Sequence, residues 1–192
     1  MSLCILSGDA SISRRRRQAG VHSDVYIATG RVRELISEQD AYWSEGLITP
    51  TTGELLWICL SLDQLHAYLD IRPGTVRNVS VFCDNVLAID CVLLGPDAAV
   101  GYDAYHLCPL AQLCHERVTR LRNRGCQLRS ALRPRRGRHS RLVESADARA
   151  RQAREACWPL LSTADLRDAL RAASDVLHAL RQEDRDFMLD HF

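Results

Sequence analysis

The sequence contains no lysine, because all 25 of its lysine-or-arginine residues are arginines. This absence excludes Schiff-base chemistry and a Walker-type phosphate loop, since both need a lysine amine. Guanidinium groups suit phosphate oxygens, so any anion binding would fall to arginine. Arginines are dense from residue 117 to 141, whereas the segment from 165 to 190 is mainly acidic. We therefore expect a polyanionic partner for the middle of the chain.

Long apolar runs and paired cysteines are missing too. No run approaches the ~20 residues that span a bilayer, and the first residues lack the features of a secretory signal. The eight cysteines include no C-x-x-C pair, the usual pattern of zinc and dithiol redox sites. We expect free thiols in a reducing, intracellular compartment, without distinguishing nucleus from cytoplasm.

The apolar pattern predicts one α/β domain with a helical appendage. Alternating residues predict strands, and apolar residues at steps of three and four predict helices. The first strand is expected to end at Asp9 and the third to span 31–38. The order βββαβαβα predicts a mixed five-stranded sheet with helices on both faces. The expected strands cover 3–9, 21–29, 31–38, 79–85 and 126–132, and the expected helices 55–69, 86–94, 107–123 and 142–157.

An extra helix is expected at the C-terminal end. We divide the chain into a domain over 1–157 and an extension over 158–192. The apolar stripe of the extension spans only two heptads, so we favour packing on the domain's own surface over a coiled coil with a partner. Its members are Leu166, Leu170, Ala173, Leu177 and Leu180.

Four acidic residues stand at matching places in these elements. Asp9 and Asp84 end strands, whereas Glu54 and Asp147 lie in first turns of helices. Each alone reads as a turn residue, a capping acid or a partner of the helix dipole. If the two strands are neighbours, however, all four acids can meet at one edge. Each close pair then repels by about 4 kcal/mol at an effective dielectric of 20. Oxygen ligands favour Mg²⁺ or Mn²⁺, and two such ions suit phosphodiester hydrolysis.

Four motifs in order resemble those of type 1 ribonucleases H, above all the ribonuclease H domains of retroelement reverse transcriptases. Residues 5–11 (ILSGDAS) resemble the first-strand D-G-S motif, and residues 51–55 (TTGEL) the helix motif T-x-x-E-L. Residues 81–85 (VFCDN) resemble a strand ending in T-D-S or T-D-N, and residues 144–151 (ESADARAR) the last-helix motif N-E-x-A-D-x-x-A-R. The resemblance covers about residues 3–157.

The resemblance implies a ribonuclease H-like fold and an endonuclease that cuts the RNA strand of RNA/DNA hybrids. It implies two Mg²⁺ ions, replaceable by Mn²⁺, on Asp9, Glu54, Asp84 and Asp147. A reverse transcriptase domain or polyprotein is the implied partner, and no membrane is involved. The rival interpretation is a non-catalytic scaffold or nucleic-acid-binding module of the same fold in a reverse-transcription complex.

The chain departs from these motifs at two places. Ala10 replaces the glycine that usually follows the first aspartate, which narrows backbone freedom there. The histidine of the family's mobile loop corresponds to His139, which stands closer to Asp147 than usual and among Arg135, Arg136 and Arg138. We carry the proton-shuttling role to His139, with an ordinary surface histidine as the alternative.

Candidate nucleic-acid contacts flank these motifs. Ser11, Thr52 and Asn85 could contact 2′-hydroxyl groups, by which proteins distinguish RNA from DNA, although turn and cap roles explain them as well. Basic residues could hold the phosphate backbone, although such runs are also ordinary solvated surface. These basic candidates are Arg14, Arg15, Arg135, Arg136 and Arg138.

Overall fold

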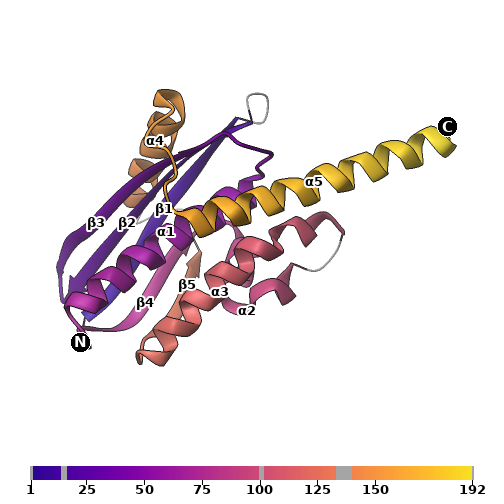
Figure 1. The fold of residues 1–192 in the computed structure, drawn as a ribbon. Coiled ribbons are helices and arrows are strands. Elements are labelled where there is room, and N and C mark those ends of the chain that lie inside the picture. Colours follow the sequence, from indigo (N-terminus) through magenta and orange to yellow (C-terminus); the bar gives the residue numbers. More distant parts are fainter. Residues whose placement is uncertain (1, 14–16, 100–101, 133–139, 192) are drawn as a thin grey trace.

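A five-stranded mixed sheet forms the centre of the molecule (Figure 1). The structure is a computed structural model, and it describes residues 2–13, 17–99, 102–132 and 140–191. The strand order is β3-β2-β1-β4-β5. β1 pairs antiparallel with β2 and parallel with β4, and β5 runs parallel to β4. The predicted α/β fold and its element order are confirmed. The strands are β1 (Ser2–Ser13), β2 (Gln18–Thr29), β3 (Val32–Trp43), β4 (Val76–Cys83) and β5 (Gln127–Leu132).

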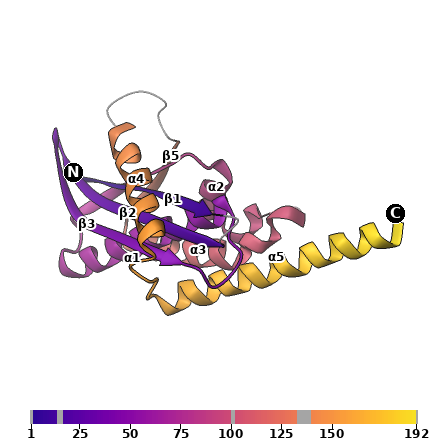
Figure 2. The same ribbon diagram turned by 90° about the horizontal axis from the view of Figure 1, so that it is seen from above.

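The helices lie on both faces of the sheet, as Figure 2 shows. α4 packs on β1, β2 and β3, whereas α1, α2 and α3 lie on the other face. The α-helices are α1 (Pro50–Ile71), α2 (Val86–Leu94), α3 (Cys108–Asn123), α4 (Ser140–Ala156) and α5 (Ala164–His191), and the 3-10 helices are η1 (Gly95–Ala98) and η2 (Tyr102–Leu107).

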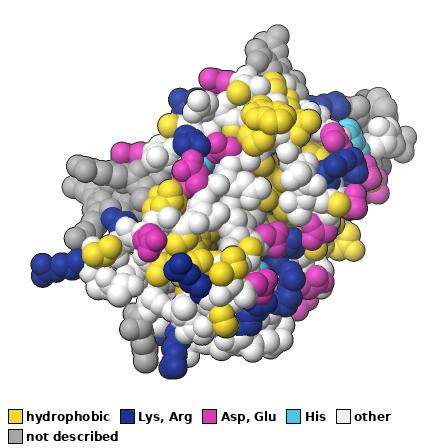
Figure 3. Space-filling view, turned by 60° about the vertical axis from the view of Figure 1, so that its left-hand side comes forward, with side chains coloured by type: hydrophobic (Ala, Val, Ile, Leu, Met, Phe, Trp, Pro, Cys, Tyr) yellow, Lys and Arg dark blue, Asp and Glu magenta, His cyan; other side chains and the backbone are white. Residues whose placement is uncertain are grey.

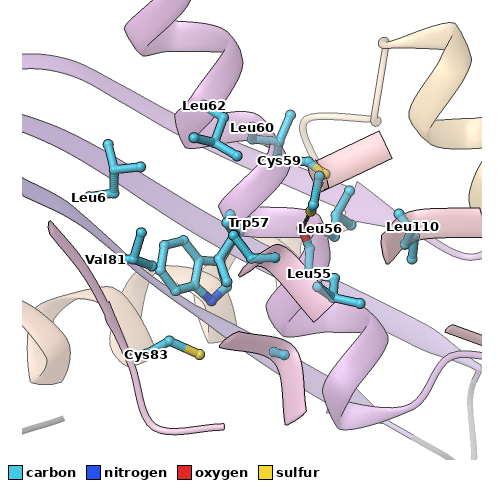
Figure 4. Close-up of a cluster of buried hydrophobic side chains, with 14 of the residues drawn as sticks. Leu6, Leu55, Leu56, Trp57, Cys59, Leu60, Leu62, Val81, Cys83 and Leu110 are labelled. Atoms are coloured by element: carbon cyan, nitrogen blue, oxygen red, sulfur yellow. Dashed lines mark hydrogen bonds between the residues drawn. The ribbon is translucent and has the colours of Figure 1, made fainter. Parts of the chain in front are cut away.

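The main core lies between the sheet and α1. In Figure 4 the indole of Trp57 on α1 lies beside Val81 and extends toward Cys83, both on β4. All three side chains are at most 3% exposed. Gly8 makes this approach feasible, because a Cβ there would stand 2.5 Å from the Trp57 ring. α1 is therefore pressed against the strands that carry the predicted acids.

Four strands differ by more than one residue from their predicted bounds. β2 begins at Gln18 rather than at residue 21, and β4 spans Val76–Cys83 rather than 79–85. β1 does not end at Asp9 but continues to Ser13, because β2 pairs with it as far as Ser13 opposite Gln18. β3 continues beyond residue 38 to Trp43, which pairs with Ala19. Antiparallel pairing thus holds β1 and β3 beyond the point where their local apolar alternation stops.

α1 begins earlier than the helix predicted over 55–69. Its first residue is Pro50, and its capping box joins Thr49 to Thr52. The Thr49 N–H donates to the Thr52 hydroxyl at 2.7 Å, and the Thr52 N–H donates to the Thr49 hydroxyl at 3.2 Å. Glu54 is consequently free of the cap.

The first half of α5 packs on the domain, as predicted for its apolar stripe. Leu166, Leu170 and Ala173 are each at most 1% exposed. The segment before the helix adds backbone pairing, since the Tyr42 N–H donates to the Pro159 carbonyl at 2.6 Å. The later part of α5 extends away from the body of the molecule (Figure 1). The division into 1–157 and 158–192 stays a prediction.

All eight cysteines are free thiols, as expected. Among the described residues no helix combines the length and the apolar character needed to cross a membrane.

Candidate metal-binding site

Glu54 is held in a buried position by the local structure of α1. Gly53, just before it, packs on β1 so closely that a Cβ would come 2.7 Å from the Ala10 Cβ. Glu54 is 7% exposed. Its Oε2 accepts a hydrogen bond from Trp57 Nε1 at 2.6 Å and another from Cys83 Sγ at 3.3 Å. Both donors use Oε2, so Oε1 takes part in neither hydrogen bond.

Two aspartates lie at the same level of the central strands. Asp84 follows the last residue of β4 and is exposed, and ligand atoms of Glu54, Cys83 and Asp84 all lie within 4.8 Å of one another. In the parallel pair Ser7 stands opposite Phe82. Two further residues in that register bring Asp9 level with Asp84. Asp9 is not part of that 4.8 Å group, although its charge acts on Glu54, so the predicted meeting of Asp9 with Glu54 and Asp84 stays a prediction.

The negative charges of the cluster repel one another, and a bound cation would relieve this repulsion. Burial, together with the charges of Asp9 and Asp84, raises the pKa of Glu54 to about 8, against the lowering effect of the Trp57 and Cys83 hydrogen bonds. Burial also raises the pKa of Cys83, so this thiol stays protonated and donates to Glu54. At neutral pH the cluster holds a proton on Glu54 that a bound cation would displace.

The donor set fits a hard divalent cation. Asp9, Asp84 and Oε1 of Glu54 offer carboxylate oxygens, which Mg²⁺ and Mn²⁺ prefer. A protonated thiol is a poor ligand for either ion, so Cys83 acts here as a hydrogen-bond donor. Thiolate-seeking metals such as zinc are disfavoured by the raised pKa of that thiol.

Asp147 stands on a different element and has a different neighbour. It lies in the first half of α4, and its carboxylate accepts from Arg151 of the same helix at 3.0 Å. The next turn of α4 lies over β2, since a Cβ on Gly20 would come 2.2 Å from the Ala150 carbonyl oxygen. Gly20 pairs with Ser11 of β1. Asp147 is outside the 4.8 Å group of Glu54, Cys83 and Asp84, and its role as fourth ligand stays a prediction.

A second polar network, not predicted from the sequence, lies beside Asp9. His22 pairs with Asp9 across β1 and β2 and is 2% exposed. Its Nδ1 bonds Asp40 at 2.6 Å and its Nε2 lies 3.1 Å from Asp24. Burial lowers the pKa of His22, but the two aspartates outweigh burial and raise it overall. No local sequence pattern predicts this network, because His22 and Asp40 come together only through the pairing of β2 with β3.

The same network ties α4 to the sheet. The Arg149 guanidinium pairs with Asp40 at 2.8 Å and also with Glu38. Ligand atoms of His22, Glu38 and Asp40 lie within 4.8 Å of one another, as in a metal site. Both carboxylates already share the Arg149 guanidinium as their partner, so the network is an anchor for α4 rather than a second cation site.

The remaining predicted residues have diverse positions. Thr52 is 1% exposed, with its hydroxyl used in the α1 cap. The Asn85 side chain caps α2 through the Ala88 N–H at 3.0 Å and donates to Thr51 at 3.1 Å. Ser11 lies in β1, partly buried. Outside the described residues lie Arg14, Arg15, Arg135, Arg136, Arg138 and His139.

Comparison with solved structures shows the fold. The N-terminal ribonuclease H domain of a Mycobacterium tuberculosis protein is 15% identical, with 80% of this chain and 99% of that chain covered and a TM-score of 0.55. LC11-RNase H1, solved with an RNA/DNA hybrid, is 17% identical, with 80% and 98% covered and a TM-score of 0.57. A foamy viral protease-reverse transcriptase, solved with double-stranded DNA, is 12% identical, with 81% and 94% covered and a TM-score of 0.54.

The chain therefore has a ribonuclease H-like fold, as its ordered motifs predicted. The similarity includes both free-standing ribonucleases H and a reverse transcriptase. No protein-family model matches the chain. No curated protein matches it either.

Proposed function

We propose that the protein is an endonuclease that hydrolyses the RNA strand of RNA/DNA hybrids with two divalent metal ions. The observation that carries the proposal is the group formed by Glu54, Cys83 and Asp84 at the end of β4, toward which the pairing of β1 with β4 directs Asp9. Asp147, on a helix that packs across β1, is the proposed fourth ligand. Structurally similar proteins include one that binds an RNA/DNA hybrid, which supports this substrate class.

Each residue has a defined part in the proposed reaction. The bound ions would supply activation of water and stabilisation of the leaving oxygen. Glu54 gives up its proton on metal binding, and Trp57 and Cys83 hold its Oε2 so that Oε1 stays oriented. His139 would carry protons between the site and solvent. Asp84, the most exposed of the three acids, is the ligand nearest to incoming substrate.

Substrate selection would depend on shape and sugar chemistry rather than on bases. Ser11, Thr52 and Asn85 are the proposed contacts to 2′-hydroxyls, although the buried Thr52 hydroxyl already serves the α1 cap. We expect little sequence preference. The proposed phosphate contacts are Arg14, Arg15, Arg135, Arg136 and Arg138. A reverse transcriptase domain or polyprotein is the proposed protein partner.

Cleavage of a labelled hybrid tests this function directly. The purified protein should cut the RNA strand of a hybrid in Mg²⁺ or Mn²⁺ and not in EDTA, and should leave single-stranded RNA largely intact. Asp84→Asn should lower the cleavage rate by at least about a hundredfold, because it removes a ligand of the metal ions that would stabilise the negative charge of the transition state. Asp175→Asn, at an exposed position on α5, is the matched control and should keep full activity. An Asp84→Asn protein with the wild-type rate would refute the assignment.

The rival function is a non-catalytic module of the same fold. The pairing of Asp147 with Arg151 favours it, because a guanidinium on the fourth acid competes with a cation. Isothermal titration with Mg²⁺ discriminates between the two. Heat of binding that disappears in Asp84→Asn supports the nuclease, whereas no heat in the wild-type protein supports the scaffold.

A further inference from the structure

A hollow lies where β4 and β5 begin, at the opposite end of β4 from the candidate metal site. Two adjoining cavities of about 520 and 410 Å³ share Gly74, Val76 and Arg124. A third, of about 560 Å³, continues along the start of β5. Gly74 and Gly125 at the rim have positive φ, and a Cβ added to either would meet nothing within 4 Å, so the rim is open. The hollow is thus large and accessible.

Four arginines line this hollow and make it basic: Arg77, Arg122, Arg124 and Arg129. We call it the arginine hollow. Asp70 is the acid among the described lining residues, and it pairs with Arg124 at 2.6 Å. In the part of the chain that the structure describes, the other three arginines have no ion-pair partner. On the face that Figure 3 shows, several arginine side chains lie next to acidic ones. The arginine hollow therefore carries an uncompensated positive charge.

An open strip of the sheet joins the arginine hollow to the candidate metal site. Val79 and Val81 of β4 point into the core, so Asn78 and Ser80 point to the opposite face, where both are partly exposed. In β5, Arg129 is paired with Ser80 and shares that face. α4 packs on β1, β2 and β3 on this side of the sheet and leaves the described parts of β4 and β5 less covered. Polar groups thus line the path from the hollow as far as Ser80 and Arg129, and Phe82, which is paired with Ala131, covers the last step before Asp84.

The length of this path matches a short stretch of nucleic acid. β4 has eight residues, and at ~3.3 Å per residue it spans about 23 Å. Double-stranded DNA advances ~3.4 Å per nucleotide of each strand along its axis, and at that rise the path corresponds to about seven nucleotides. Guanidinium groups at one end and carboxylates at the other suit a duplex whose backbone is gripped away from the bond that is cut.

We propose that the arginine hollow binds the phosphate backbone of a nucleic-acid duplex about seven nucleotides from the carboxylate cluster. The inference rests on the proposed nuclease function and adds a second, distant contact to it. The contact raises affinity without reading bases, because phosphates carry no sequence information. It also makes binding depend on substrate length, since a duplex too short to reach the hollow gains nothing from it.

Fluorescence anisotropy with the full chain tests the contact separately from catalysis. All proteins carry Asp84→Asn, so that no substrate is cut, and bind labelled hybrids of six and eighteen base pairs without Mg²⁺ at several salt concentrations. The test variant adds Arg77→Gln, Arg122→Gln and Arg129→Gln. The matched control adds Arg181→Gln, which removes one exposed arginine from α5. Circular dichroism checks that each variant is folded, and Arg129→Gln alone replaces the triple variant if that one unfolds.

The triple variant should bind the long hybrid at least about tenfold more weakly, with a salt slope smaller by about 2 to 3, as expected for three lost phosphate contacts. Its affinity for the short hybrid should be unchanged, and the control should match the parent on both. Equal affinity of triple variant and parent for the long hybrid would overturn the proposal, as would an equal loss on the short one. Length-dependent binding in a protein that cuts no hybrid would support the contact while rejecting the nuclease.

Discussion

The buried carboxyl group of Glu54 makes a direct prediction about pH and metal binding. Its pKa is raised by burial from the ordinary 4.5 to about 8. A raised carboxyl pKa means that the metal-free fold loses stability as the pH rises from about 4.5 through 8, because Glu54 must ionise in a dry site. A divalent cation should offset this loss. We expect Mn²⁺ or Mg²⁺ to raise Tm by several degrees at pH 8 and much less at pH 5.5.

Thermal melts at pH 5.5 and 8, with EDTA or metal, measure this effect. Glu54→Gln removes the titrating group but keeps the shape and the acceptor for Trp57, so its metal-free Tm should vary less with pH and should respond little to metal. Asp168→Asn, at an exposed position on α5, is the control and should behave as the parent. A wild-type metal effect of equal size at both pH values would contradict the proposed proton release.

The contact between Ala10 and Gly53 yields a second prediction. Ala10 stands where the resembled motif has glycine, and a Cβ on Gly53 would come 2.7 Å from the Ala10 Cβ and 3.0 Å from Ile12 Cδ1. Gly53→Ala should therefore cost about 1 to 3 kcal/mol of folding free energy, because it overpacks the joint between α1 and β1. The double variant Gly53→Ala with Ala10→Gly should recover part of the loss. Urea unfolding of both singles and the double measures the coupling, and simple additivity would reject direct contact.

The acidic residues of the candidate site could be proposed from the sequence alone. Asp9, Glu54 and Asp84 could be predicted because each stands in a motif that a strand end or a helix start makes recognisable. Trp57 follows Glu54 at the i+3 spacing of a helix, but nothing local shows that its indole donates to the carboxylate. Cys83 read as an ordinary buried thiol, because its partner lies 29 residues away in the chain. Such contacts depend on how α1 is pressed against β4.

The bounds of a helix or strand could be predicted where they depend on nearby residues in the sequence. The bounds of α2 match the prediction, because its apolar pattern ends at Gly95, whereas β4 begins three residues before the predicted strand and ends two residues before that strand's end. The ends of β1 and β3 were missed, since their last residues are held by pairing with β2 rather than by their own alternation. The start of α1 at Pro50 precedes the predicted start at residue 55, because Thr49, Thr51 and Thr52 all suit a helix start and only the fold selects among them.

The anchoring of α4 gives the prediction at the element scale. Arg149 joins α4 to β3 through Asp40 and Glu38, and Asp40 also bonds the buried His22. Arg149→Gln leaves these acids without their guanidinium partner, so we expect a loss of about 1 to 3 kcal/mol and a lower cleavage rate through looser placement of Asp147.

Urea unfolding and cleavage of a labelled hybrid measure the two effects. The comparison variant is Arg151→Gln, which removes an ion pair within α4 whose side chains are 57% and 46% exposed. Such exposed pairs contribute little, so its stability should change by less than about 0.5 kcal/mol. Equal stability losses in the two variants would show that the contact between α4 and β3 has no special weight.

At the scale of the whole molecule, the first turns of α5 pack into the core of the domain. Arg117 on α3 is 2% exposed and pairs with Asp63 on α1 at 2.7 Å and Asp165 on α5 at 2.8 Å. The pKa of this guanidinium is raised because the two carboxylates outweigh burial. Three helices are therefore joined by one buried cation, next to the apolar stripe of α5.

Substitution at Leu170 tests whether domain and extension unfold as one unit. Leu170 is 1% exposed, so Leu170→Ala should cost about 2 to 5 kcal/mol. In a chain of this size that loss lowers Tm by roughly 5 to 15 °C. Leu160→Ala, at a side chain that is 62% exposed, is the control and should leave Tm nearly unchanged. A single calorimetric transition at a lower Tm would support one core shared by the domain and the extension. A new low-temperature transition, with the main one unmoved, would instead support the division at residue 157.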